Sequence, residues 1–175
     1  DETASLLAEK AEGWIVGLRL AALSMRVLSD EKAFVQRFKG TSSVLIVEYL
    51  LSEVLARQSP EIQDFVLRTS VLDRFCVSLC ESVIGITATQ SQETIAWIAQ
   101  ANLFLVPLDE EGRWYRYHHL FRDLLRERVR HRLSPDEIVT IQTRASEWFE
   151  QSGLTEEALE HALAAGDMDR AAKLV

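Results

Sequence analysis

The sequence predicts a mainly α-helical fold with one β-hairpin, and three observations support this prediction. Only three prolines and seven glycines occur in 175 residues, so few breaks interrupt the chain and long helices are expected. Apolar residues recur at helical spacing over most of the chain, which is typical of helices with one buried face. The period changes to that of strands only around residues 103–118.

Composition excludes several classes of function. Apolar residues make up 47% and charged residues 26% of the chain, as in ordinary globular proteins. The formal net charge of −8 argues against a chain whose main task is to hold a nucleic-acid backbone, although it allows a local basic patch. No apolar run reaches the roughly 18 residues of a membrane span. Cys76 and Cys80 indicate a pair of cysteines in the core, and a redox pair is the alternative. We expect a cytoplasmic protein without membrane contact.

The first part of the chain is predicted to consist of helices. Residues 2–28 carry apolar positions at helical spacing, which Gly13 divides into a short and a longer helix. A further helix begins at the N-cap candidate Asp30, and another follows the break at Gly40. Three more helices are expected before the strands. Ser59 caps the first of them, the second ends at Gly85, and Ser91 caps the third.

The apolar runs LFLVPL and RWYRYH predict two strands, and the acidic turn DEEG joins them into a hairpin. Pro107 marks the first strand as an edge or terminal strand. A helix over residues 120–133 follows. The pattern of helices, a two-stranded wing and another helix describes a winged-helix module.

The C-terminal part is predicted to be an antiparallel helix pair that begins at Ser134 and Pro135 and turns at Gly153. A further helix opens at Gly166 and Asp167. This spacing resembles the first unit of a tetratricopeptide-like solenoid. Because one repeat cannot bury its own face, we expect the chain to be a fragment. The small residues expected at close helix contacts are Ala158, Ala162, Ala164 and Ala165.

The stretch 113–132 combines histidines, arginines and aromatic residues, but it does not predict a catalytic or metal site. His118 and His119 are adjacent, so their side chains are expected to point in different directions and not to share a metal ion. His131 and His161 lack ligand spacing with the cysteines. The sequence contains neither a nucleophile elbow nor a phosphate-binding G-x-x-x-x-G-K-[ST] loop.

The arginines of residues 120–133 allow two interpretations. The first is a solvated polar face of an amphipathic helix that packs on nothing. The second is a basic surface of a DNA-binding winged helix. By position, however, the recognition helix would be the one over residues 91–103, and it contains no arginine or lysine. The arginines in question are Arg122, Arg126, Arg128, Arg130 and Arg132.

Four segments resemble, in this order, the middle of the large ATP-dependent transcription regulators of the MalT type within the LuxR family. They are AEGWIVGLRLAALSM, YLLSEVLARQSPEIQDFVLRTSVLDRFCVSLCESVIG, ANLFLVPLDEEGRWYRYHHLFRDLLRERV and EQSGLTEEALEHALAAGDMDRAAKLV. The hairpin followed by YHHLF is the most specific part of this resemblance. Such regulators are similar to the signal-transduction NTPases, in which a P-loop domain precedes a helical domain, a winged-helix domain, sensor repeats and a DNA-binding helix-turn-helix.

The resemblance implies that residues 1–56 form the helical domain, residues 57–132 the winged helix, and residues 133–175 the start of the tetratricopeptide-like sensor repeats. No enzymatic activity and no cofactor are expected of this part alone, whereas the intact protein is expected to bind ATP and ADP and to hydrolyse ATP slowly. The expected partners are its own N-terminal nucleotide-binding domain, a small-molecule or protein inducer at the downstream repeats, and DNA only through the C-terminal domain. A protein-interaction scaffold is the other function left open.

The resemblance also implies residues near the nucleotide. In the related switches, a Met-His-Asp motif opens the helix after the wing, and its histidine contacts the β-phosphate of ADP in the resting state. His118 matches that histidine, and His119 replaces the aspartate. A Gly-x-Pro motif packs near the adenine, and Gly13, Trp14 and Ile15 match it, with isoleucine in place of proline. The chain is thus expected to be the regulatory arm of a nucleotide-driven transcription switch.

Overall fold

The computed structural model describes residues 55–100 and 105–175. The chain divides into two compact units, residues 1–59 and residues 60–175, and nearly all described residues belong to the second. The helices predicted before residue 55 lie outside the described residues, and so do the predicted adenine-side positions Gly13, Trp14 and Ile15.

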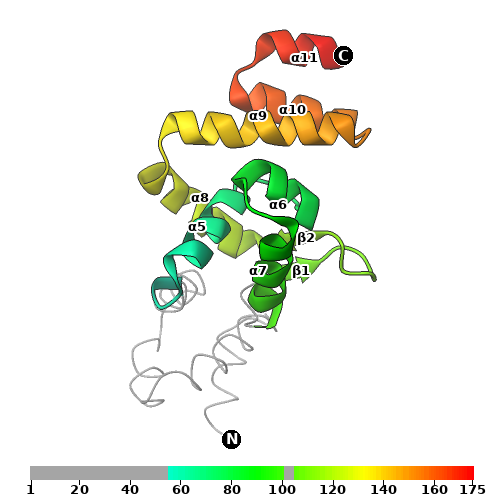
Figure 1. The fold of residues 1–175 in the computed structure, drawn as a ribbon. Helices are drawn as coiled ribbons and strands as arrows, with labels where there is room; N and C mark the ends of the chain where they lie inside the picture. Colours follow the sequence, from blue (N-terminus) through cyan, green and yellow to red (C-terminus); the bar gives the residue numbers. More distant parts are fainter. Residues whose placement is uncertain (1–54, 101–104) are drawn as a thin grey trace, which may run out of the picture. The chain divides into compact units, whose positions relative to one another are not determined.

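The second unit consists of helices and one hairpin (Figure 1). The prediction of a mainly α-helical fold with one β-hairpin is therefore confirmed for the described residues. In chain order the elements are α5 (Pro60–Thr69), α6 (Val77–Ile84), α7 (Ala88–Gln100), β1 (Leu105–Pro107), β2 (Tyr115–Tyr117), α8 (His119–Arg132), α9 (Pro135–Gln151), α10 (Thr155–Ala165) and α11 (Met168–Leu174).

Local signals in the sequence explain where several helices begin and end. Helix α6 ends at Gly85, whose φ of 80° lies in the left-handed region that glycine adopts at low cost. Helix α9 begins with a capping box, in which the Ser134 side chain accepts a hydrogen bond from the backbone N–H of Glu137, and the Glu137 side chain accepts from that of Ser134. At α11, the Asp167 side chain accepts a hydrogen bond from the backbone N–H of Arg170.

The predicted start of α7 is wrong. This helix begins at Ala88, three residues before the predicted cap Ser91, which is fully buried inside it. The cap is Thr87, which forms a capping box with Gln90. The backbone N–H of Gln90 donates to Thr87 Oγ1 at 3.2 Å, and that of Thr87 donates to Gln90 Oε1 at 3.0 Å. The residues expected to form a loop therefore contribute the first turn of the helix.

The hairpin pairs Leu105 with Tyr117 and Pro107 with Tyr115 in antiparallel register. The second strand is shorter than the predicted run RWYRYH, since it covers Tyr115–Tyr117, whereas residues 103–104 of the first predicted strand lie outside the described residues. On the other side of β2, Phe75 forms an isolated bridge with Tyr115. The Phe75 N–H donates to the Tyr115 carbonyl at 2.8 Å, and the Tyr115 N–H donates to the Phe75 carbonyl at 2.9 Å. Strand β2 is thus held on both edges, while Pro107, which lacks an N–H, lies on the outer strand as predicted.

The core of the winged-helix part surrounds the end of β2. Tyr117 is 1% exposed, and its ring lies 5.0 Å from that of Phe75 and 5.3 Å from that of Phe121, measured between centroids. Cys80 is fully buried and its thiol pKa is raised well above its ordinary value by burial, which agrees with a core cysteine. The buried apolar residues of helices α5 to α8 and of the loop between α5 and α6 complete this core, and they include Val66, Leu72, Leu79, Ile98 and Leu125.

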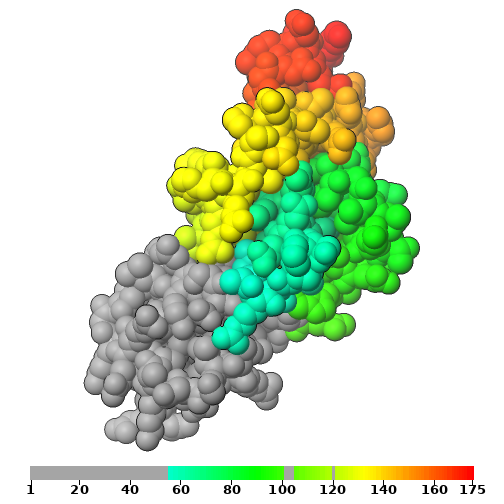
Figure 2. Space-filling model, turned by 60° about the vertical axis from the view of Figure 1, so that its left-hand side comes forward, coloured from blue at the N-terminus to red at the C-terminus, as the bar shows by residue number. Residues whose placement is uncertain are grey.

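The C-terminal helix pair packs directly on the winged-helix part. Helix α9 contacts α6 on one side and α10 on the other, and α11 packs on α10 (Figure 1). In the space-filling view the surface passes without a break from the green and cyan helices to the yellow and orange pair (Figure 2). Ala158 and Ala162 are fully buried and allow the close approach predicted for them, but Ala164 is exposed and does not contribute to it.

Candidate switch site at the junction of the hairpin and helix α8

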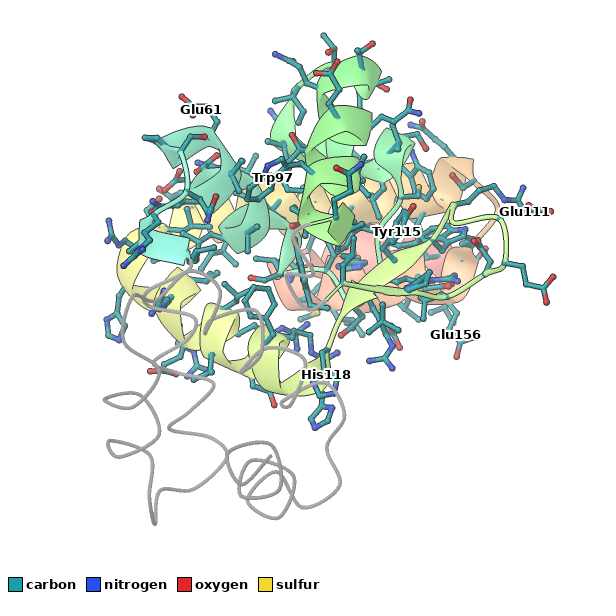
Figure 3. All side chains as sticks on the ribbon, turned by 90° about the horizontal axis from the view of Figure 1, so that it is seen from below. Glu61, Trp97, Glu111, Tyr115, His118 and Glu156 are labelled. Carbon is teal, nitrogen blue, oxygen red and sulfur yellow. The ribbon has the colours of Figure 1, made fainter. Side chains whose placement is uncertain are left out.

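His118 lies between the last residue of β2 and the first residue of α8 (Figure 3). It occupies the N-cap position of α8 with φ of −57° and ψ of 139°, and its side chain forms no capping hydrogen bond. Its carbonyl accepts a hydrogen bond from the Arg122 N–H at 3.0 Å. The first turn of α8 contains no acidic residue. The backbone here is therefore compatible with an anion near the helix N-terminus.

The His118 imidazole is half-buried and lies close to its neighbour. The ring centroids of His118 and His119 are 4.3 Å apart with an interplanar angle of 35°. The prediction that these two side chains point apart is thus wrong, because His118 is extended whereas His119 is already helical. The pKa of His118 is lowered below 6.5 by burial, and then by the charges of His119 and Arg116. The ring is therefore neutral at pH 7, with one nitrogen that can donate a hydrogen bond.

A buried hydrogen bond fixes the strand that positions His118. The Tyr117 hydroxyl lies 2.8 Å from Thr69 Oγ1, and Thr69 Oγ1 donates to the Phe65 carbonyl at 2.7 Å. Because the threonine proton is already used, the tyrosine must donate to the threonine oxygen. Burial raises the pKa of Tyr117, so the hydroxyl stays protonated at neutral pH. The residue before His118 is thereby tied to α5.

Two arginines of α8 bind the loop between α5 and α6 instead of forming a solvated face. Arg122 and Arg126 each donate to Asp73 at 3.0 Å, and Arg126 also donates to the Ser70 carbonyl at 3.2 Å. For these two residues the predicted solvated face is wrong. Arg130 instead pairs with Glu127 on the same helix, where both side chains are well exposed. The basic appearance of this helix is thus partly explained by its contacts with the loop between α5 and α6.

The loop between α5 and α6 also contacts the C-terminal helix pair through Arg74, which sequence reasoning missed. Its guanidinium lies 4.4 Å from the centroid of the Trp114 ring and forms an ion pair with Glu157 of α10. Trp114 in turn packs edge-on against Trp148 and is stacked against Phe149, both on α9. No local pattern signals these contacts, because Arg74 and Glu157 lie 83 positions apart in the sequence.

A cleft of about 700 Å³ opens beside this cluster. It is lined by residues of α6, α7, the hairpin and α9, among them Cys76, Gln92, Arg113, Trp114 and Trp148.

Helix α7, the recognition helix by position, contains no arginine or lysine. In the described ranges, no three histidine, cysteine or acidic residues come together as a metal site. None of the helices in residues 55–100 and 105–175 is long and apolar enough to cross a membrane.

The comparison with protein families agrees with this arrangement of helices around a wing. The family model described as the MalT winged helix domain matches residues 51–138, about half of the chain. The chain belongs to this family. The resemblance to MalT-type regulators expected from the sequence is thereby confirmed.

Curated relatives match almost the whole chain. The serine/threonine-protein kinase PknK of Mycobacterium tuberculosis is 37% identical over 169 residues, which is 97% of this chain and 15% of the relative. The HTH-type transcriptional regulator MalT of Klebsiella pneumoniae is 35% identical over 167 residues, 95% of this chain and 18% of the relative. The MalT of Yersinia pestis is 32% identical over 165 residues. The chain spans less than a fifth of the length of these MalT-type relatives and of PknK.

Proposed function

We propose that this chain is the regulatory segment of a nucleotide-controlled, MalT-like transcription activator, and that His118 senses the nucleotide. In the resting state of the intact protein, the His118 imidazole donates a hydrogen bond to the β-phosphate of ADP bound to the N-terminal nucleotide-binding domain. Inducer binding at the downstream repeats then favours the state in which this contact is broken, a population shift between two packed arrangements. DNA is bound through a separate C-terminal domain.

The observation that carries the proposal is the position of a neutral imidazole at the start of α8. His118 leaves the capping role unused, and no acidic side chain in the first turn of α8 opposes an anion there. Its lowered pKa keeps the ring neutral when no phosphate is present. A phosphate beside it would raise that pKa, because a nearby negative charge favours the imidazolium. Contact with ADP would thereby favour the protonated ring, and a protonated ring would bind the phosphate more strongly.

The replacement of the family's aspartate by His119 changes what supports this contact. An aspartate could accept a hydrogen bond, whereas the His119 ring lies against His118 and lowers its pKa. We infer that His118 is held mainly by β2 and the Tyr117 hydrogen bond, and not by its neighbour in the motif.

The DNA-binding alternative has less support. A winged helix that reads DNA needs cations on the helix that enters the groove. Helix α7 has none, and Arg122 and Arg126 of α8 are already paired with Asp73.

The test is the substitution His118→Ala in the intact regulator. Loss of the contact should raise inducer-independent transcription and speed the dissociation of a fluorescent ADP analogue by roughly tenfold or more, as expected for a hydrogen bond to a charged group. His131→Ala is the matched control, because His131 lies near the other end of α8, is well exposed and is paired with Glu127 on the same helix. If the His118 variant keeps wild-type basal transcription and wild-type ADP dissociation, the proposed role of His118 is wrong.

A further inference from the structure

We propose that Arg74 is the residue that couples the C-terminal helix pair to His118, so that displacement of the repeats changes the nucleotide contact. This inference rests on the proposed function of His118 and names the route by which that site is regulated. Arg74 is a positioning residue, since it acts through β2 and does not itself reach the nucleotide.

The first step is the contact between Arg74 and the helix pair. The guanidinium lies over the face of Trp114 and pairs with the carboxylate of Glu157 on α10. A guanidinium can do both at once because its flat face stacks on a ring while its edge donates hydrogen bonds. The side chains of Arg74 and Glu157 are only 35% and 28% exposed, so water screens their attraction less than at an open surface.

The second step is the contact between Trp114 and α9. The Trp114 ring is 5.9 Å from that of Trp148 and 6.3 Å from that of Phe149. Phe149 is itself stacked on His161 of α10, with ring centroids 5.2 Å apart. Arg74 and Trp114 thus touch both helices of the pair, and a movement of either helix would disturb them.

The third step leads from this cluster to His118. Phe75, the neighbour of Arg74, is joined by two backbone hydrogen bonds to Tyr115, the neighbour of Trp114. From Tyr115, strand β2 runs directly to His118 and covers about 10 Å in three residues. Because β2 is paired on both edges, a displacement at Trp114 shifts the strand as a unit. Figure 3 shows Tyr115 and His118 at the two ends of this strand region.

Other contacts hold the two parts together without touching β2. Arg68 of α5 pairs with Glu137 at the start of α9 at 2.8 Å, and Arg144 of α9 donates to the Val83 carbonyl of α6 at 3.2 Å. These contacts should preserve the packing of α9 when Arg74 is changed. The effect of an Arg74 substitution on nucleotide exchange can therefore be separated from loss of the fold.

The experiment measures dissociation of a fluorescent ADP analogue from the intact regulator by stopped flow. Arg74→Gln and Glu157→Gln should each speed dissociation about two- to fivefold, the range expected for a partly exposed ion pair. The double variant should be no faster than the faster single variant, because both changes break one contact. Arg74→Lys, which keeps the charge, should restore part of the wild-type rate. The matched control is Arg113→Gln, which removes a cation from the residue next to Trp114 and breaks its exposed pair with Glu111.

The combination of Arg74→Gln with His118→Ala separates this inference from the proposed function. If Arg74 acts through His118, adding its substitution to the His118 variant leaves the dissociation rate unchanged. Additive rates, or an Arg74 effect no larger than that of Arg113, would overturn the coupling role even if His118 alone behaves as proposed. If His118→Ala has no effect while Arg74→Gln does, the route through His118 is wrong. Glu157→Gln provides the same test from the partner helix should the Arg74 variant fail to fold.

Discussion

The hydrogen bond between Tyr117 and Thr69 allows a quantitative test of how β2 is held. Both residues are buried, with exposed fractions of 1% and 0%. Tyr117→Phe keeps the ring contacts with Phe75 and Phe121 but removes the donor. The free energy of unfolding should fall by about 1 kcal/mol, the net contribution of one hydrogen bond. For a chain of this length, the melting temperature should then drop by about 2–4 °C.

The reciprocal change should cost more. Thr69→Val leaves the buried Tyr117 hydroxyl without its acceptor, and a buried unsatisfied group costs about 1–3 kcal/mol. In the double variant neither partner remains, so its loss of stability should be smaller than the sum of the two single losses by roughly 1 kcal/mol. Urea denaturation followed by circular dichroism measures the free energy of unfolding of the wild type, the two single variants and the double variant. Strict additivity, or a Thr69 variant no less stable than the Tyr117 variant, would refute the assigned donor and acceptor.

Two further predictions concern buried polar groups, besides those already given for His118 and Arg74. Ser91 Oγ is fully buried without a hydrogen-bond partner in the described part of the chain. Ser91→Ala should therefore raise the free energy of unfolding by up to about 1 kcal/mol. A loss of stability in this variant would contradict the prediction, because it would mean that the hydroxyl does have a hydrogen-bond partner. Burial lowers the pKa of His161 below 6.5, although the charges of Asp73 and Glu157 act to raise it. As the pH drops below about 6.5, the unfolded chain therefore takes up the proton first, and the stability of the folded chain falls. His161→Phe, which retains the ring stacked on Phe149, should flatten the decline in melting temperature between about pH 7 and pH 5, and an unchanged slope would contradict this.

Several local features could be predicted because their signals lie within a few residues. Pro60, Ser134 and Gly85 mark the ends of helices through their own backbone preferences. The start of α7 had such a signal too, since Thr87 and Gln90 have the spacing of a capping box. It was missed because Ser91 has the same capping chemistry, and only burial shows that its side chain lies inside the helix.

The candidate site was predictable only in part. The resemblance to MalT-type regulators singled out His118, and the structure places it at the start of α8, where that resemblance expects it. The sequence did not reveal that its ring faces His119, because the backbone changes from extended to helical between the two residues. The predicted adenine-side residues at 13–15 lie outside the described residues, so that part of the site stays a prediction.

The sequence by itself determined the mainly helical fold, the position of the hairpin and the family, because helical periodicity, turn residues and motif spacing are local properties of the chain. Only the tertiary structure decided which charged and aromatic side chains meet. Arg126 binds Asp73, and Arg74 binds Glu157 and covers Trp114, across separations of 53, 83 and 40 positions that no periodic pattern encodes. An arginine on a polar face looks the same in sequence whether it is solvated or paired. Its partner depends on how the helices pack, and that packing joins the winged helix to the helix pair.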